Sequence, residues 1–221
     1  MGITERKTRE KEERRALILE RAKELILERG IPALSMQDIA DAAELSKATL
    51  YLYFQSKEAI LAEILSDAAD AFVSFVEERL SPADSGLQAL RKLWGSYLTF
   101  FGESPDIFVL TGIKRFIEPY PLTDDESAQA PTERKLRGLI AKVFERGVKD
   151  GTMDKDIDPD RVAHIAMTIA LSIIDNVARL PREARDVRRI QEEMRNTFEL
   201  LLRGVAAAGT DRKSLTLPGK E

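Results

Sequence analysis

The sequence predicts an all-α protein. Apolar residues recur at spacings of three and four through most of the chain, and no segment shows the strict alternation of a half-buried strand. Hydrophobic residues make up 43% of the chain and charged residues 33%, which is typical of a helix-rich globular protein. A chain of 221 residues can form one large domain or two modest domains, each with a core of its own.

The first expected helix covers residues 13–29 and ends at Gly30, because glycine commonly terminates helices. Its apolar stripe consists of Ile18, Ala22, Leu25 and Ile26. Residues 1–11 carry closely mixed charges without an apolar run. We therefore expect a flexible charged arm there, and no signal peptide.

Two short helices follow one another over residues 35–54. Ser35 begins the first and Ser46 begins the second, since each supplies a side-chain oxygen that can cap free backbone N–H groups. The first helix ends near Ala43, so the turn is short and the two helices must cross at a steep angle. The second helix carries polar and aromatic side chains suited to base edges and phosphates. This pattern indicates a helix-turn-helix that binds DNA.

A long helix is expected from Ser56 to Arg79, and it can join the DNA-binding part to a second domain. Further helices are expected at residues 87–103, 105–117, 131–150, 159–180 and 184–206. Exposed loops are expected over 118–131 and 151–159. Residues 207–221 combine Gly, Pro and scattered charge, which predicts a disordered tail.

A longer run of residues surrounds the helix-turn-helix at regular spacing. The run is Ile18-Leu19, Ala22, Leu25-Ile26, Gly30, Ser35, Ile39-Ala40, Ala43, Leu45-Ser46-Lys47, Thr49-Leu50-Tyr51, Tyr53-Phe54, Ser56-Lys57-Glu58 and Ile60-Leu61. In this order it resembles the N-terminal domain of the tetracycline-repressor (TetR) family of bacterial transcription regulators. Members usually have Gly where this chain has Glu44, and often where it has Ala48. A positive φ at Glu44 would cost about 1–2 kcal/mol.

The resemblance implies a three-helix DNA-binding domain over residues 12–72 and a helical effector-binding and dimerisation domain over 73–206. It implies a cytoplasmic homodimer that binds a palindromic double-stranded DNA operator. We expect a repressor that a small, largely apolar ligand releases from its operator. The alternative is a DNA-binding protein without an effector, which acts in nucleoid organisation or through a protein partner.

The expected DNA contacts lie in and around the helix-turn-helix. They are Ser35, Gln37, Lys47, Thr49, Tyr51, Tyr53 and Lys57. Lys57 stands at the start of the long helix, where free N–H groups already favour a phosphate. For Tyr51 the alternative is packing against the first helix, whereas Leu50 and Phe54 are expected in the core.

Net charge is −4 and the isoelectric point is near 5.4, so we expect modest non-specific affinity for DNA. The basic residues are nevertheless clustered near the start of the chain. The cluster consists of Arg6, Lys7, Arg9, Lys11, Arg14 and Arg15. A local basic face of this kind is sufficient for phosphate contacts.

Other residue patterns bound the function. The chain has no cysteine, which excludes disulfides and thiolate metal sites and fits the cytoplasm. His164 is the only histidine, so we expect no metal site, and no apolar run reaches the roughly 20 residues of a membrane span. Glycine-rich phosphate loops and HExxH motifs are absent from the sequence. We expect no catalytic residues, no cofactor and no enzymatic activity.

The last two expected long helices resemble an association surface. Ile190, Met194, Thr197 and Leu201 fall at spacings of four, three and four, which keeps one face toward a partner helix. Packing within one subunit explains the same spacing. The family resemblance favours the dimer, because members pair through a four-helix bundle of these helices. Asp175 follows an apolar run, which leaves a salt bridge, a cavity or exposure as its explanation.

Aromatic residues are concentrated in the middle of the chain. At helical spacing they are most simply core residues. The resemblance implies an apolar effector cavity in this domain, for which we predict a lining of Trp94, Tyr97, Phe101, Phe116 and Asn176.

Overall fold

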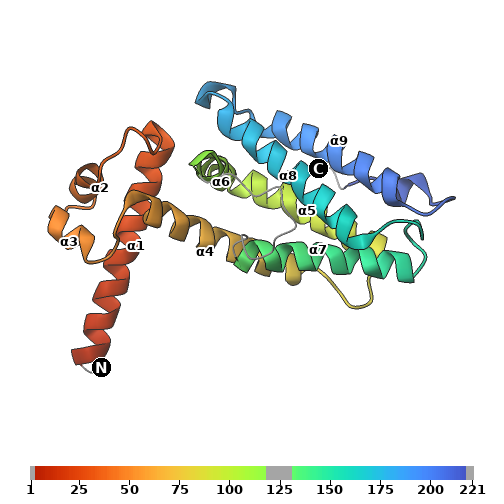
Figure 1. Cartoon of the computed structure of the whole chain (residues 1–221), viewed down its shortest axis with the longest axis horizontal. Helices are drawn as coiled ribbons and strands as arrows, with labels where there is room; N and C mark the ends of the chain where they lie inside the picture. The colour runs from red at the N-terminus through yellow and green to blue at the C-terminus, as the bar shows by residue number, and fades with distance from the viewer. Residues whose placement is uncertain (1–2, 118–130, 218–221) are drawn as a thin grey trace. The chain divides into compact units, whose positions relative to one another are not determined.

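The computed structural model describes residues 3–117 and 131–217 of the chain (Figure 1). It divides into two compact units, Met1–Asp67 and Ala68–Glu221. The described residues form helices, turns and one isolated antiparallel bridge between Met153 and Ala206, with no strand among them. The predicted all-α class is confirmed. The expected loop over 118–131 lies almost wholly outside the described residues.

The first unit contains α1 (Ile3–Arg29), α2 (Met36–Ala42), α3 (Lys47–Tyr51) and the start of α4 (Lys57–Glu77). Its core is built from side chains that are at most 1% exposed. They are Ile18, Ala22, Ile26, Ile39, Ala40, Leu50 and Ile60. These residues come from all four helices, so each helix is held by the face that its apolar spacing predicts.

Helix α1 begins ten residues before the expected start. The expectation of a flexible arm over 1–11 therefore differs from the structure, in which residues from Ile3 onward are helical. Two ion pairs at i,i+4 spacing, Arg6–Glu10 and Arg9–Glu13, connect successive turns of this segment. The mixed charges that suggested a loose arm are thus arranged at the spacing that supports a helix.

The second unit contains the rest of α4 followed by five longer helices and two short 3₁₀ turns among the described residues. They are α5 (Gly86–Glu103), α6 (Pro105–Ile117), α7 (Pro131–Lys149), α8 (Pro159–Arg179), η2 (Arg182–Ala184), α9 (Val187–Val205) and η3 (Arg212–Leu215). Helix α8 packs against α6 and α7, while α5 packs against α7 and α9 (Figure 1). Of the described helices, α8 alone is long and apolar enough to cross a bilayer by length and composition.

The contact between α5 and α7 depends on Gly86. A Cβ atom added to Gly86 would lie 2.1 Å from the backbone nitrogen of Gly147. The two backbones therefore meet at a distance that no side chain permits. The N–H of Gly86 also donates to Asp150 Oδ2 at 2.7 Å, which fixes the first turn of α5 to the end of α7.

Residues 207–217 are ordered, although the sequence suggested a disordered tail over 207–221. Leu215 and Leu217 are 8% and 5% exposed, so this segment buries apolar side chains. The N–H of Leu217 donates to Glu199 Oε1 at 2.9 Å, and Arg91 Nε donates to the Thr216 carbonyl at 3.0 Å. Two leucines buried against the helices offset the flexibility that the Gly and Pro content favours.

Candidate nucleic-acid interface

Helix α2 starts with a complete capping box. The Asp38 N–H donates to Ser35 Oγ at 3.2 Å, and the Ser35 N–H donates to Asp38 Oδ2 at 2.7 Å. Hydrogen bonds from the Ser35 side chain and backbone lower the pKa of the Asp38 carboxyl below its ordinary value. Ser35 and Gln37 are both exposed at this end of α2, and Gln37 Nε2 donates to Asp41 Oδ1 at 2.7 Å.

Glu44 has a positive φ of 55° in the turn between α2 and α3. The Leu45 N–H donates to the Ala40 carbonyl at 2.8 Å, and the Glu44 N–H donates to the Asp41 carbonyl at 3.1 Å. These two bonds form the Schellman arrangement, in which the residue after the helix adopts the left-handed conformation. The positive φ occurs at the position where family members usually have glycine.

Helix α3 separates a buried face from an exposed face. Ser46 caps it by accepting from the Thr49 N–H at 3.1 Å, and Leu50 is fully buried beneath it. Lys47 is exposed and Tyr51 is 40% exposed, so both are available to a partner. Thr49 is half-buried, and its hydroxyl lies 2.8 Å from Ser46 Oγ. The expected core position of Leu50 agrees with the structure.

Leu52 is 79% exposed immediately after α3, and the sequence analysis did not single it out. This exposed leucine gives the C-terminal end of α3 an apolar contact point. Thymine methyl groups in the major groove are apolar targets of this kind. The sequence could have indicated this exposure, because a residue two positions after the buried Leu50 lies on roughly the opposite side of the helix.

Tyr53 is half-buried, and its backbone is held by Arg15 of α1. Arg15 Nη1 donates to the Tyr53 carbonyl at 3.5 Å, and its guanidinium carbon lies 4.5 Å from the centre of the Phe54 ring. The same guanidinium forms an ion pair with Glu63 of α4 through Nε at 2.6 Å and through Nη2. Arg15 therefore connects α1, the segment after α3 and α4, which the sequence alone did not indicate.

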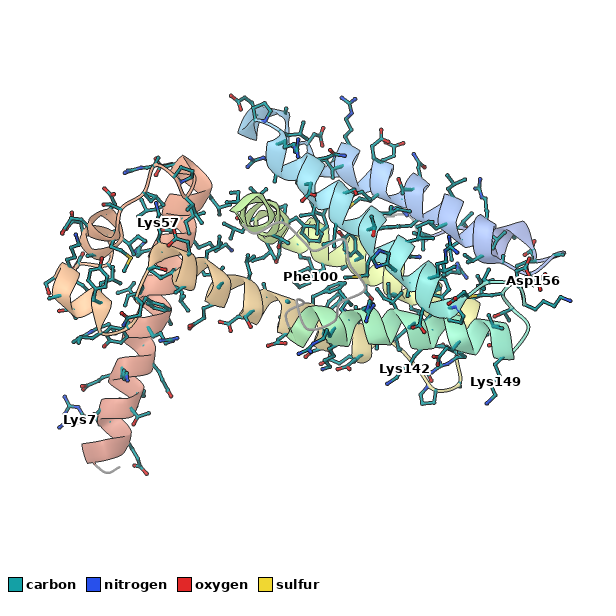
Figure 2. The ribbon with its side chains drawn as sticks, in the orientation of Figure 1. Lys7, Lys57, Phe100, Lys142, Lys149 and Asp156 are labelled. Carbon is teal, nitrogen blue, oxygen red and sulfur yellow. The ribbon has the colours of Figure 1, made fainter. Side chains whose placement is uncertain are left out.

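The Lys57 ammonium already has hydrogen-bond partners within the first unit, and the residue is labelled in Figure 2. Its Nζ donates to the carbonyls of Ile31 and Leu34, each at 2.7 Å. These carbonyls belong to the segment between α1 and α2. The ammonium has three donors, so at most one remains for a phosphate. The phosphate contact of Lys57 stays a prediction, and its ammonium also bonds the segment between α1 and α2.

The N-terminal part of α1 presents a separate basic face. Lys7, Lys11 and Arg14 share one side of the helix, because spacings of four and three repeat each turn. The same side continues to Ile18, which is fully buried where α1 packs in the first unit. Lys7 projects to the side of α1 on which α2 and α3 lie (Figure 2). This places positive charge beside the helix-turn-helix.

Three of the predicted effector-pocket residues are packed in the core of the second unit. Trp94 stacks on Phe198 with ring centres 4.3 Å apart, Tyr97 donates to the Ala170 carbonyl at 3.2 Å, and Phe101 is fully buried. Asn176 is exposed on α8, away from these core side chains, and the side chain of Phe116 lies outside the described residues. Packing as core explains the three described aromatic residues.

The predicted association seam on α9 mixes two faces of that helix. Met194 is fully buried inside its own subunit, so it cannot face a partner chain. Ile190, Thr197 and Leu201 are half-exposed. Leu200 of the same helix, which was not among the predicted seam residues, is 69% exposed. Met194 fits the heptad spacing because buried residues on the inner face of a helix repeat with the same period as residues that face a partner helix.

Comparison with known proteins identifies the class of this interface. Residues 18–64 match the family described as bacterial regulatory proteins, tetR family. The HTH-type transcriptional repressor KstR2 of Rhodococcus jostii is 33% identical over 147 residues, which span 66% of this chain and 70% of that protein.

Two solved structures share the fold. The ketosteroid transcriptional regulator KstR2 of Mycobacterium tuberculosis superposes with a TM-score of 0.65 at 22% identity, covering 87% of this chain and 95% of that one. The TetR family transcriptional regulator PfmR of Thermus thermophilus superposes with a TM-score of 0.63 at 28% identity, covering 84% and 94%.

Proposed function

The chain belongs to the tetR family of bacterial regulatory proteins, and from this membership we propose a homodimeric repressor that a small apolar ligand releases from a palindromic operator. It is a DNA-binding regulator of transcription. The observation that carries the proposal is the exposed face of α3. Lys47 and Tyr51 are available to a partner there, while Leu50 anchors the opposite face in the core.

The proposed DNA contacts are of two kinds, contacts to base edges and contacts to phosphates. Tyr51 and Leu52 read base edges in the major groove, where hydroxyl and apolar groups distinguish base pairs. Lys47 and the N-terminal surface of α2, with Ser35 and Gln37, contact phosphates and fix the orientation of the protein on the duplex. Thr49 and Tyr53 border this surface, and both are half-buried.

The basic face of α1 adds phosphate contacts outside the groove. Lys7, Lys11 and Arg14 supply three positive charges to that face. Arg6 and Arg9, by contrast, pair with Glu10 and Glu13. Contacts of this kind raise affinity for any DNA sequence and make binding sensitive to salt.

A dimer through α8 and α9 is supported by their exposed apolar residues. Ile165 of α8 is 44% exposed and Leu200 of α9 is 69% exposed. A two-fold dimer would present two copies of α3 to successive major grooves, about one helical turn apart. Palindromic operators follow from that symmetry.

The proposed effector is small and largely apolar. A relative that shares the fold is titled a ketosteroid transcriptional regulator, which describes an apolar ligand class for that protein. In this chain the aromatic core of the second unit supplies apolar surface. A ligand that binds one conformation of the dimer more tightly would shift the population toward it and lower operator affinity by the difference.

The experiment is selection of binding sites from a random duplex library, followed by affinity measurements at about 150 mM salt, where non-specific binding is weak. The account expects an enriched palindrome that binds at least about 1,000-fold more tightly than random duplex. A protein that organises the nucleoid would enrich no sequence and bind both duplexes alike. That result would favour the effector-independent alternative.

A further inference from the structure

Helix α5 has a polar face that borders a pocket. Gln88, Lys92, Gly95 and Thr99 fall at spacings of four, three and four, so they lie on one side of the helix. A pocket of about 530 Å³ opens over this side. Its volume lies within the range of small-molecule sites, about 300–1,000 Å³.

The charged residues that line the pocket are mostly basic. Arg79 from the segment after α4, together with Arg91 and Lys92 of α5, contributes three positive charges, and Asp84 contributes one negative charge. Lys92 Nζ donates to the two carboxylate oxygens of Asp84 at 2.7 and 2.9 Å. The charges of Lys92 and Asp84 cancel, so the net positive charge of the pocket comes from the guanidinium groups of Arg79 and Arg91.

Asp84 remains ionised in this arrangement. Burial raises the pKa of its carboxyl, but hydrogen bonds from Lys92 Nζ and from the Ser81 N–H outweigh burial, so the pKa lies below its ordinary value. Lys92 is therefore matched by a carboxylate at neutral pH. An anion that enters the pocket would meet Arg79 and Arg91 as its main partners.

Both guanidinium groups have more N–H donors than their hydrogen bonds to the backbone use. Arg79 Nη1 donates to the Phe75 carbonyl at 2.8 Å, and its guanidinium carbon lies 3.3 Å from the centre of the Phe75 ring. Arg91 Nε donates to the Thr216 carbonyl at 3.0 Å. These bonds orient the two side chains and use few of the five N–H donors that each guanidinium carries. Such pre-oriented forks match phosphate and carboxylate groups.

One of the residues that line the pocket, Ser96, has a buried hydroxyl without a hydrogen-bond partner in the described part of the chain. The residue is 3% exposed. A buried hydroxyl in this condition costs free energy. The unsatisfied group is independent of the charges and lies in the same pocket wall.

Gly95 lines the pocket and leaves unfilled space at its position. A Cβ atom at this position would meet no atom within 4 Å, so the space above it is empty. Glycine inside a helix costs about 1 kcal/mol relative to alanine. Position 95 therefore admits substitutions that change the pocket and disturb no existing contact.

We propose that this pocket binds a small anionic molecule, whose phosphate or carboxylate group is held by Arg79 and Arg91. This anionic ligand differs in chemistry from the apolar effector proposed above. It is recognised by charge and hydrogen bonds.

The test is isothermal titration calorimetry of the full chain with inorganic pyrophosphate and, separately, with citrate at low salt. Wild-type protein is expected to bind at least one of them, and the stronger of the two identifies phosphate or carboxylate as the preferred group. Gly95→Glu places a carboxylate in the pocket and is expected to weaken binding about tenfold or more, equivalent to about 1.4 kcal/mol. Gly95→Ala is the matched control at the same position and is expected to retain binding.

A second control removes a positive charge elsewhere. Lys142 is exposed on α7 and does not line the pocket, so Lys142→Ala is expected to leave binding unchanged. Thr99→Glu, one turn along α5, repeats the test if circular dichroism shows that Gly95→Glu is not folded. No binding of either anion by the wild type would overturn the proposal. Equal binding by wild type and a folded glutamate variant would overturn it as well.

Discussion

The ammonium of Lys57 lies 2.7 Å from the carbonyl oxygens of both Ile31 and Leu34, across 26 and 23 residues of sequence. These carbonyls follow α1 and precede α2, and the Ile31 carbonyl also accepts from the Leu34 N–H at 3.1 Å. A single side chain at the start of α4 thus fixes the segment that positions the helix-turn-helix. The charge that the sequence suggested for DNA is therefore also bonded to the protein's own backbone.

Replacing Lys57 with methionine is expected to destabilise the first unit. Hydrogen bonds to charged groups contribute about 1.5–3 kcal/mol, and methionine retains the length of the side chain without its donors. Urea unfolding followed by circular dichroism would measure the loss. The salt dependence of DNA binding is expected to change little. A stable Lys57→Met protein with a reduced salt slope would instead assign Lys57 to phosphate.

Glu44→Gly is expected to stabilise the protein by about 1 kcal/mol, because glycine adopts a positive φ without the cost borne by other residues. Ala48→Gly is the matched control. Position 48 lies within α3, where glycine costs about 1 kcal/mol relative to alanine. The two changes are therefore expected to shift the denaturation midpoint in opposite directions. A lower midpoint for Glu44→Gly would contradict the role assigned to this turn.

Much of the first unit could be predicted from the sequence, because its signals are local. Ser35 and Ser46 cap helices within three residues of themselves, and Leu50 lies on the apolar side of its own helix. The roles of Arg15 and Lys57 could not be predicted, since their partners lie 48 and 26 residues away. Charge clustering does not distinguish a basic side chain that is free from one that is bonded.

The second unit was harder to predict for a related reason. Helical spacing identifies an apolar face but does not say which neighbour covers it, so Met194 was assigned to a partner although its own subunit buries it. The same ambiguity applied to the aromatic residues, where Trp94 stacks on Phe198 about 100 residues later. Partners so far apart in sequence follow only from the packed structure.

Leu200→Glu is expected to convert the dimer into a folded monomer. Leu200 is 69% exposed within one subunit, so the change disturbs no internal packing. At a two-fold interface it would bury an unpaired charge in each copy, at a cost of several kcal/mol. Sedimentation velocity would report the mass. Leu52→Glu, which alters an exposed leucine of the first unit, should remain dimeric. An unchanged mass for Leu200→Glu would exclude this face of α9 from the interface.

The exposed face of α3 is tested most directly by the Lys47→Ala/Tyr51→Ala double variant. Its affinity for the selected operator would be measured by fluorescence anisotropy, beside Lys142→Ala as a control for lost charge. Contacts to bases and phosphates are each worth about 1–3 kcal/mol, so removing both is expected to lower affinity at least about 30-fold. Both residues are exposed, and the melting temperature should therefore stay within about 2 °C of wild type. Wild-type operator affinity in a folded double variant would contradict the account.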